Sequence, residues 1–362
     1  MAIRYTRAMP KARVLIDVER LRQPNSGLGQ VALHLGTEYL AHPSDAWEPV
    51  FLIPENRLGT YGQDIACEIP SRRRRYFPNL APRYDLWHIL HQDASYLPGA
   101  ATPYVLTIND LNFLGEKSPP KAAKRLRKVQ KLVDGATAVT VISKFTESVV
   151  REHLEFGGTP VEVVYCGLCS DPCGAQTRPA FAPDTPFLFT LGVVRRKKNF
   201  HVLVDMLALL DGLSLIIAGN TGDAYADEVR ERARALGVGE RVIIAGEIDD
   251  GHKNWLFDNC EAFVFPSLHE GFGLPVLEAM SFGKPTFSSA LTSLPEIGGE
   301  DVFYWDNFEP QHMAEVLRGG LSRFREDTQR GSRLRARADE FSWRNAAHQY
   351  AQLYERILAD RR

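Results

Sequence analysis

The sequence predicts an α/β protein built from two domains of the same architecture. Its 362 residues exceed the roughly 250–300 residues that a single hydrophobic core usually serves. Short β-branched and aromatic runs alternate with longer helical stretches along the chain, which is the pattern of parallel sheets covered by helices. A stretch rich in Gly, Pro and Cys at 166–186 interrupts this alternation. We therefore expect one parallel-sheet domain on each side of that stretch.

The predicted strands are short runs of apolar residues with helical stretches between them. Before the interruption they are ARVLIDV, EPVFLI, DLWHIL, PYVLTI, TAVTVI and VEVVY. After it they are PFLFTLG, LSLIIAG, RVIIAG, EAFVFP and KPTFSS. Beyond Phe341 a terminal amphipathic helix is predicted from residues at helical spacing, namely Trp343, Ala346, Ala347, Tyr350, Leu353 and Leu358. We expect domains at 1–170 and 171–340, and a helix at 341–362 that packs back towards the first domain.

Composition and charge narrow the classes of partner. A net charge of −2 does not provide the domain-wide basic surface of a nucleic-acid-binding protein. The N-terminal segment has no signal-peptide pattern and the chain has no run of about 18 apolar residues, so we expect a cytoplasmic protein. Cys166, Cys169 and Cys173 lie close together, but no nearby histidine completes the four ligands of a structural zinc site. We expect free thiols there and no metal.

The segment PSLHEGFGLPVLEAM, residues 266–280, carries the strongest functional signal. It directly follows a predicted strand, and Gly271 and Gly273 allow the backbone to approach a ligand closely. Pro275 suits the first turn of a helix, where its missing N–H costs nothing. A strand, a glycine turn and a helix N-terminus together form an anion-binding site.

Two glutamates flank this glycine turn. Glu270 precedes it, and Glu278 falls near the end of the first turn of the helix. A carboxylate accepts pairs of hydrogen bonds, which suits the vicinal hydroxyls of a sugar or a ribose on either side of a phosphate. The alternative is that Glu278 only complements the helix dipole and Glu270 is solvated.

Embedded in EGFGLPVLEAMSFGKP, these glutamates resemble the two-glutamate signature of the family-4 retaining glycosyltransferases of bacterial surface-polysaccharide synthesis. The resemblance implies the GT-B fold, in which two Rossmann-like domains face each other across a cleft that holds a nucleotide-sugar donor. It implies that Glu270 neighbours the donor sugar and takes part in catalysis, and that Glu278 binds the nucleotide ribose. It also implies donor contacts for Gly271, Phe272 and Gly273.

A basic segment supplies the complementary charge. TLGVVRRKKNFHVLVDML places four cations between a strand end and a helix start, namely Arg195, Arg196, Lys197 and Lys198. Cations there can neutralise a diphosphate. Aligned with the family on Gly192 and Asn199, Lys198 matches the catalytic cation, and Lys197 and Arg196 are expected donor contacts. The family's other arginine position is Val193 here, and the residues leave open whether Arg195 or Arg196 replaces it.

A second glycine turn precedes the first long helix of the N-terminal half. In NSGLGQVALHL, Gly27 and Gly29 open a helix after a short loop. A plain tight turn is the alternative. The family uses its first glycine loop opposite the diphosphate, so the resemblance implies that these glycines bind the donor and face Lys198 and Gly271 across the cleft.

Three further segments end predicted strands of the N-terminal half. TINDLNFLGEKSPP resembles the family's His-Asp-Leu segment, but Asn109 stands where histidine is usual, so this catalytic position can orient a sugar but cannot titrate. Asp110 is either a sugar contact or structural. In DLWHILHQDASYLP, His91 is expected to contact the acceptor or the sugar, whereas His88 is expected to be structural. Ser143 is expected to cap a helix.

Two basic segments have two interpretations. Arg72–Arg75 and the helix with Lys121–Lys131 either are solvated or bind an anionic membrane surface, which would make the protein peripheral on the inner face of the plasma membrane.

The sequence therefore predicts a retaining glycosyltransferase that moves a sugar, with mannose as first choice, from a GDP- or UDP-linked donor to a saccharide or lipid-linked saccharide acceptor. No Asp-x-Asp triplet occurs, and we expect no metal and no cofactor beyond the nucleotide-sugar co-substrate. The alternatives are a non-catalytic or decayed sugar-nucleotide-binding protein, and an epimerase or phosphorylase of the same fold.

Overall fold

The computed structural model describes all residues except 1–9, 81, 169–170, 172, 223 and 362, and divides the chain into two compact units. The first unit comprises the described residues within Met1–Ile142, Glu147–Val164 and Trp343–Arg362. The second comprises those within Ser143–Thr146 and Tyr165–Ser342. The sequence placed the boundaries at 170/171 and 340/341; the units divide at 164/165 and 342/343, and the short segment 143–146 joins the second unit. We describe each unit by itself.

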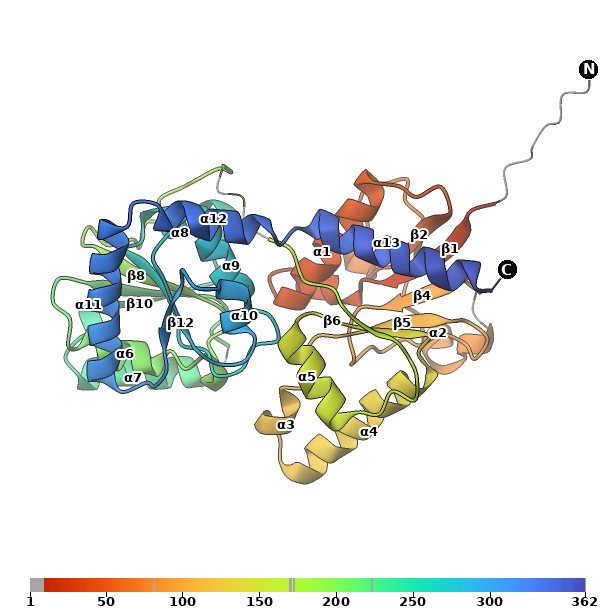
Figure 1. The fold of residues 1–362 in the computed structure, drawn as a ribbon, viewed down its shortest axis with the longest axis horizontal. Helices are drawn as coiled ribbons and strands as arrows, with labels where there is room; N and C mark the ends of the chain where they lie inside the picture. The colour runs from red at the N-terminus through yellow and green to blue at the C-terminus, as the bar shows by residue number, and fades with distance from the viewer. Residues whose placement is uncertain (1–9, 81, 169–170, 172, 223, 362) are drawn as a thin grey trace, which may run out of the picture. The chain divides into compact units, whose positions relative to one another are not determined.

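The first unit is a seven-stranded parallel sheet with helices on both faces (Figure 1). Its strand order is β3-β2-β1-β4-β5-β6-β7, the order of a Rossmann fold. The strands are β1 (Ala12–Asp17), β2 (Trp47–Leu52), β3 (Cys67–Glu68), β4 (Leu86–Ile89), β5 (Tyr104–Ile108), β6 (Ala138–Val141) and β7 (Val161–Val163). The helices are η1 (Glu19–Arg22), α1 (Gly27–Ala41), η2 (Glu55–Arg57), α2 (Arg72–Tyr76), η3 (Pro78–Leu80), α3 (Phe113–Glu116), α4 (Pro119–Gly135), α5 (Lys144–His153) and α13 (Trp343–Ala359).

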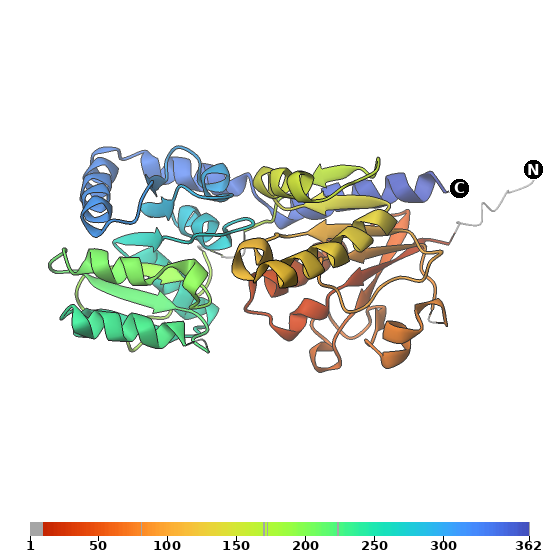
Figure 2. The same cartoon turned by 90° about the horizontal axis from the view of Figure 1, so that it is seen from below.

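Alternate residues of each buried strand serve opposite faces of this sheet. Trp87 and Ile89 of β4 pack into an apolar cluster with α4 and α5, which lie beside each other in Figure 2. His88, between them, lies on the other face, where α1 and α13 pack against each other. The central strands are thus buried on both sides, which explains why they read as continuous apolar runs.

A buried polar network attaches α13 to this second face. The Tyr354 hydroxyl lies 2.9 Å from the Tyr39 hydroxyl and 2.5 Å from His88 Nδ1, and His88 Nε2 lies 2.8 Å from Thr107 Oγ1. All four side chains are at most 3% exposed. The predicted terminal helix and its packing on the first domain are therefore confirmed. One position differs, because Ile357 rather than Leu358 continues the buried stripe.

The second unit is a six-stranded parallel sheet in the order β10-β9-β8-β11-β12-β13, which repeats the Rossmann order. The strands are β8 (Phe187–Leu191), β9 (Ser214–Ala218), β10 (Val242–Gly246), β11 (Ala262–Phe265), β12 (Thr286–Ser289) and β13 (Phe303–Trp305). The helices are η4 (Arg196–Lys198), α6 (His201–Leu207), α7 (Tyr225–Ala235), η5 (Gly239–Arg241), α8 (Asp250–Asn259), α9 (Leu274–Ser281), α10 (Leu294–Gly298), α11 (Pro310–Glu326) and α12 (Arg330–Asp339).

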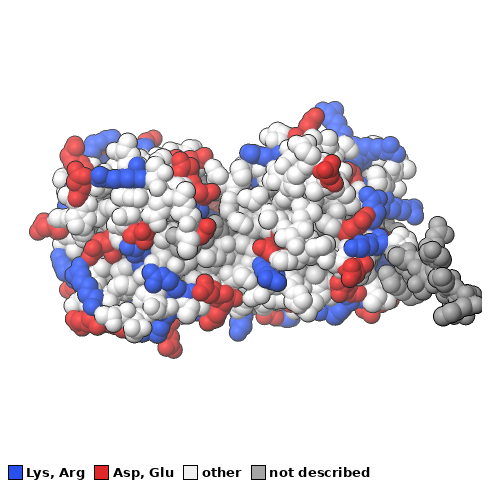
Figure 3. Space-filling model, turned by 90° about the horizontal axis from the view of Figure 1, so that it is seen from above, with Lys and Arg blue, Asp and Glu red and all other residues white. Residues whose placement is uncertain are grey.

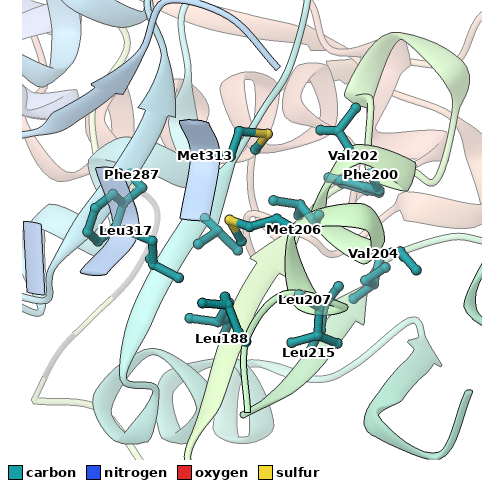
Figure 4. Packing of buried hydrophobic residues seen from close by; sticks show 14 of the residues in the cluster. Leu188, Phe200, Val202, Val204, Met206, Leu207, Leu215, Phe287, Met313 and Leu317 are labelled. Carbon is teal, nitrogen blue, oxygen red and sulfur yellow. The ribbon is translucent and has the colours of Figure 1, made fainter. Parts of the chain in front are cut away.

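The core of this unit fills the space between one sheet face and α6, α7 and α11. Figure 4 shows Leu188 and Leu215 from the sheet beside Met206 and Leu207 of α6, with Met313 of α11 across from them. On the opposite face Phe257 of α8 packs edge-on against Phe189 and at a tilt against Phe263, at centroid distances of 5.1 and 5.3 Å. Helices thus cover both faces of this sheet too.

The prediction of two Rossmann-like α/β domains is confirmed, as are all eleven predicted strands. Two strands were missed. They are β3 and β13, which have two and three residues and lie at sheet edges, too short to carry a periodic pattern. No helix within the described residues is long and apolar enough to cross a bilayer.

Candidate functional site

The candidate site lies at the carboxyl edge of the second sheet. All pairs in this sheet are parallel, so the loops that follow its strands meet at one edge. The chain leaves the neighbouring strands β8 and β11 in opposite directions, and ligands of open α/β sheets bind at such a point. The basic loop follows β8 and the glycine turn follows β11, which brings the two strongest sequence motifs together.

The glycine turn has a fixed conformation. Gly273 has φ +118° and precedes α9, and a Cβ there would lie 2.7 Å from Leu294 Cδ2. Hydroxyl groups hold the carbonyls of the turn: Ser143 Oγ donates to Gly271 O at 2.7 Å, and Ser293 Oγ donates to Phe272 O at 2.8 Å. Glycine at 273 is therefore required by the backbone as well as favoured by ligand approach.

The N–H groups of this turn remain available. Within the described part of the chain no acceptor is found for the N–H groups of Gly271, Phe272 and Gly273. Successive backbone N–H groups before a helix form a binding site for a phosphate. The turn thus has the chemistry that the sequence predicted for it.

An ion pair joins the basic loop to the glycine turn. Lys198 Nζ lies 2.5 Å from Glu270 Oε1 and 4.9 Å from the centroid of the Phe265 ring. Ser267 Oγ donates to the same carboxylate oxygen at 2.6 Å, and Glu270 N–H donates to Thr292 Oγ1 at 3.2 Å. The Lys198 and Glu270 side chains are 12% and 14% exposed. This pair can exchange partners with a ligand that brings both an anion and hydroxyl groups.

The basic loop is positioned by close backbone contact between two strand ends. Gly192 N–H donates to Ala218 O at 2.9 Å, and a Cβ on Gly219 would lie only 2.1 Å from Gly192 O. Leu268 N–H donates to Lys197 O at 2.8 Å and so ties the loop to the segment after β11. Lys198 is held at the site by these contacts.

Glu278 forms a second, deeper ion pair. Its side chain is 7% exposed, and Oε1 lies 3.3 Å from Lys253 Nζ of α8, whose other partner is Asp250 at 3.0 Å. Burial acts against the charge on Lys253, but Glu278 and Asp250 outweigh it and raise the pKa of Lys253 above its ordinary value. Sequence reasoning missed Lys253, and its place in the first turn of a helix after β10 is the signal that locates it at this edge.

Not every predicted donor contact points to this edge. Arg196 forms an ion pair with Glu228 of α7, is 69% exposed, and stacks on Tyr225 with its guanidinium carbon 5.4 Å from the ring centroid. The carbonyl of Lys197 accepts the N–H of Leu268 near the glycine turn. The ion pair with Glu270 therefore belongs to Lys198 and not to Arg196.

The predicted donor-binding glycines Gly27 and Gly29 belong to the first unit. Gly27 begins α1 and is exposed, whereas Gly29 is buried and a Cβ on it would lie 2.1 Å from Gln23 O. Gly29 is thus required by close packing. That these glycines contact the donor stays a prediction.

Asn109, Asp110 and His91 meet at the carboxyl edge of the first sheet. Asn109 Nδ2 donates to Leu90 O at 2.9 Å, and Gln92 Nε2 donates to Asp110 O at 2.7 Å. Both bonds join the loops after β4 and β5. Ser143 accepts a hydrogen bond from Thr146 N–H at 3.0 Å, so its predicted capping role is confirmed.

The basic run Arg72–Arg75 does not act as one surface, which corrects the prediction. Arg74 is 2% exposed, forms a two-pronged ion pair with Glu68, and its guanidinium carbon lies 5.2 Å from the Trp87 ring centroid. Arg72, Arg73 and Arg75 are exposed. One arginine of the run is a core residue, because it is the residue of the five-residue helix α2 that faces Glu68 and Trp87.

The predicted cysteine cluster is only partly described. Cys166 is buried, with its pKa raised to about 12 by burial, and Cys173 is exposed; Cys169 lies outside the described residues. Among the described residues no three His, Cys, Asp or Glu side chains are grouped so as to hold a metal ion. Metal independence stays a prediction.

Comparison with known families gives a match within the second unit. Residues 176–339 match the family described as Glycosyl transferases group 1. This range contains the basic loop, the glycine turn and both glutamates.

Two relatives are mannosyltransferases by name. The chain is 30% identical over 182 residues to the serotype-specific mannosyltransferase WbdA of Escherichia coli, which covers 49% of this chain and 22% of that protein. It is 26% identical over 311 residues to the O-antigen chain mannosyltransferase B of Escherichia coli, covering 76% and 78% of the two chains. The chain thus spans about a fifth of the length of the first relative and most of the second.

Among solved structures the fold resembles Anabaena Alr3699/HepE, determined in complex with UDP-glucose. The TM-score is 0.73 and the sequence identity 20%, with 95% of this chain and 99% of that chain covered. At this identity the likeness concerns the fold.

Proposed function

Because residues 176–339 form a Glycosyl transferases group 1 domain, we propose that the chain is a retaining glycosyltransferase of surface-polysaccharide synthesis. The second unit binds the nucleotide diphosphate-sugar donor. The observation that carries this proposal is that one edge of one sheet gathers Lys198, Glu270, three N–H groups without acceptors in the described chain, and buried Glu278.

Each group has a role in this reaction. Negative charge develops on the departing diphosphate, and the Lys198 ammonium and the N–H groups of Gly271–Gly273 stabilise it as preorganised charges and dipoles. Glu270, held by Ser267, accepts hydrogen bonds from hydroxyls of the donor sugar once the diphosphate takes over Lys198. Glu278, held by Lys253, accepts from the ribose hydroxyls.

The donor is an activated sugar, with GDP-mannose first and UDP-sugars next. The names of WbdA and of mannosyltransferase B favour mannose, whereas Alr3699/HepE was crystallised with UDP-glucose. The acceptor is a saccharide or lipid-linked saccharide. Transfer needs no metal, since cations and N–H groups provide the electrostatic stabilisation, and full activity in the presence of a chelator tests this.

The first experiment measures thermal stability of the full chain against a panel of nucleotides and nucleotide-sugars with chelator present. A ligand at about 100 times its dissociation constant stabilises by roughly 2.7 kcal/mol. We expect the melting temperature to rise with nucleotides of one base only. This rise is expected to be lost in Lys198→Ala and Glu278→Ala and kept in the control Lys128→Ala, an exposed residue of α4. The absence of a shift with every nucleotide diphosphate would contradict the proposal.

Asn109 supports a second candidate, a binding protein without turnover. Its amide is committed to the Leu90 carbonyl, and it cannot titrate. This candidate predicts donor binding without sugar transfer in the native chain, and transfer in Asn109→His. Sugar transfer by the native chain decides for the enzyme.

We also propose that the protein associates with an anionic membrane surface. Figure 3 shows acidic and basic side chains interspersed over one face, so we propose a membrane contact through particular basic segments only. Exposed Arg72, Arg73 and Arg75 adjoin large apolar side chains that are also exposed, namely Tyr76 at 64%, Phe77 at 59% and Leu80 at 63%. Basic residues beside exposed aromatic and aliphatic groups suit an anionic membrane interface.

Co-sedimentation with vesicles tests this association. We expect binding to phosphatidylglycerol vesicles but not to phosphatidylcholine vesicles, and loss of binding when Tyr76, Phe77 and Leu80 are all replaced by Ser. Replacing Lys124 and Lys128 of α4 tests separately whether the second basic segment contributes to vesicle binding. Equal binding to both lipids, or none, contradicts a membrane contact.

A further inference from the structure

A second polar site occupies the equivalent place in the first unit. There β1 and β4 are neighbours, and the chain leaves them in opposite directions, as it leaves β8 and β11 in the second unit. Arg20 lies on η1, which follows β1, and His91 follows β4. Ligands of Rossmann-like sheets bind at this point, so these two side chains lie where a substrate is expected.

The two side chains are joined through one ring nitrogen. Arg20 Nη2 lies 3.0 Å from His91 Nδ1, and the N–H of Asp93 donates to the same nitrogen at 3.0 Å. A ring nitrogen that accepts from two donors carries no proton, so the neutral ring has its proton on Nε2. Burial, with the nearby Arg20 and Arg125, lowers the pKa of His91 to about 3, which keeps the ring neutral at pH 7.

The outward side of this pair consists only of donors. His91 Nε2–H has no acceptor within the described residues, and the residue is partly exposed. Arg20 carries five N–H donors, and in the described structure its one hydrogen bond is the one to His91.

The charges around Arg20 are otherwise matched. Arg125 forms a two-pronged ion pair with Asp93, and Arg22 lies 3.6 Å from Glu19. Asp17 is buried, and burial raises its pKa to about 7, although the nearby charges of Arg20 and Arg22 act in the opposite direction. In the part of the chain that the structure describes, no carboxylate lies within ion-pair distance of Arg20. Arg20 is thus a partly exposed cation whose guanidinium has no ion-pair partner among the described residues.

We propose that Arg20 and His91 bind a phosphate or diphosphate group carried by the acceptor. The inference rests on the proposed function and narrows the acceptor to an anionic, phosphorylated saccharide. An arginine fork beside an N–H donor matches two oxygens of a phosphate. A neutral sugar hydroxyl would accept from His91 but would leave the charge on Arg20 unmatched. His91 acts as a neutral donor here, so it contacts the acceptor without titrating.

Calorimetric titration of the full chain with inorganic pyrophosphate tests the site. The Lys198→Ala variant serves as background, because it weakens binding of the same probe at the second unit. Adding Arg20→Gln to it is expected to weaken the remaining binding about tenfold or more, as the loss of a charge-assisted hydrogen bond does. Arg22→Gln is the matched control, since Arg22 lies on the same short helix and is 53% exposed. Equal affinity of the Arg20 and control variants would overturn the proposal.

The proton on His91 Nε2 gives a second test, which does not depend on Arg20. His91→Gln retains an N–H donor near the position of Nε2 and is expected to keep most of the affinity, whereas His91→Leu has no donor and is expected to lose about tenfold. The melting temperature of each variant is measured alongside, so that a folding defect is recognised. Equal affinity of the Gln and Leu variants at unchanged stability excludes a donor role for His91.

Two further probes identify the source of the phosphate. A short alkyl diphosphate that binds more tightly than pyrophosphate and depends on Arg20 identifies a lipid-linked acceptor, and equal binding identifies a phosphorylated sugar. Binding of glucuronate without binding of pyrophosphate overturns the phosphate assignment. Failure of the proposed function is seen separately, because the nucleotide-dependent thermal shift depends on Lys198 and is expected to persist in Arg20→Gln.

Discussion

At the scale of single residues, Gly219 shows how closely two strand ends approach beneath the basic loop. Its φ is +131°, and an added Cβ would lie 2.1 Å from Gly192 O. We expect Gly219→Ala to lower the free energy of unfolding by about 2 kcal/mol or more and to abolish the nucleotide-dependent thermal shift, because the loop that carries Lys198 must move.

Gly212→Ala is the matched control for this prediction. Gly212 also has a positive φ, +70°, but nothing lies within 4 Å of its added Cβ. Gly212→Ala therefore adds backbone strain without a close contact. We expect it to lower the free energy of unfolding by about 1 kcal/mol and to retain the nucleotide-dependent thermal shift. Chemical denaturation of both variants measures the difference, and equal costs would contradict the close-contact argument.

The pair of Lys253 and Glu278 makes a second prediction at this scale. Removing one partner of a buried ion pair leaves the other charge uncompensated, so Lys253→Met is expected to destabilise by roughly 3 kcal/mol. The double variant Lys253→Met with Glu278→Leu is expected to regain most of that stability, although it loses the ribose contact. Urea unfolding measures both, and additive losses in the double variant would mean that the two side chains act independently.

Sequence reasoning found the site residues that lie in recognisable motifs and missed those that lie outside them. Glu270 and Glu278 lie in one contiguous segment, so their spacing is visible in the sequence. Lys253 is 25 residues from Glu278, and Thr292 is 22 from Glu270. Their contacts depend on the order of strands in the sheet, which no local pattern encodes.

At the scale of secondary-structure elements, the polar network beneath α13 predicts a sensitivity to acid. Burial lowers the pKa of His88 to about 3, compared with 6.5 for an exposed histidine. Between these values the unfolded chain binds more protons than the folded chain, so stability falls as pH falls from about 6.5 towards 3. His88→Gln is expected to flatten this fall by up to about 1.4 kcal/mol per pH unit.

Asp17 provides a control of opposite sign. Its pKa is raised from 3.8 to about 7 by burial, so its contribution is fully present below 3.8 and is lost as pH rises through 7. Asp17→Asn is therefore expected to steepen the loss of stability in acid, whereas His88→Gln flattens it. Thermal unfolding between pH 4 and pH 7.5 measures both slopes, and slopes that change in the same direction contradict the assignment.

The elements that could be predicted are those with enough residues to show a period. The burial of β strands on both faces and the helical stripe of α13 each extend over several residues. Arg74 was not predictable as a core residue, because its ion pair with Glu68 and its stacking on Trp87 are tertiary contacts. A run of four arginines has no sequence feature that marks the one that is buried.

At the scale of the whole molecule, the first unit is completed by residues that follow the second unit in the chain. A chain that ends at Ser342 lacks Tyr350 and Tyr354, so His88 and Tyr39 lose buried partners. We expect this chain to lose the cooperative unfolding of the first unit while the second unit still melts and still binds nucleotide.

Hydrogen exchange followed by mass spectrometry measures the two units separately. Protection is expected to fall across β1, β4 and β5 and to persist across β8, β9 and β11, because the second core contains no residue of α13. A uniform loss of protection in both units would show that they do not fold independently.

The position of α13 in the chain also bears on synthesis at the ribosome. Domains usually fold as they emerge, the N-terminal one first. Here the second unit can complete its core while the first unit still lacks its last helix. The sheet face around His88 remains uncovered by α13 until Tyr350 and Tyr354 have emerged. The nascent chain therefore exposes the part of the first sheet that α13 later covers while residues 165–342 are translated. A chaperone that binds exposed apolar surface would find its binding site in this interval.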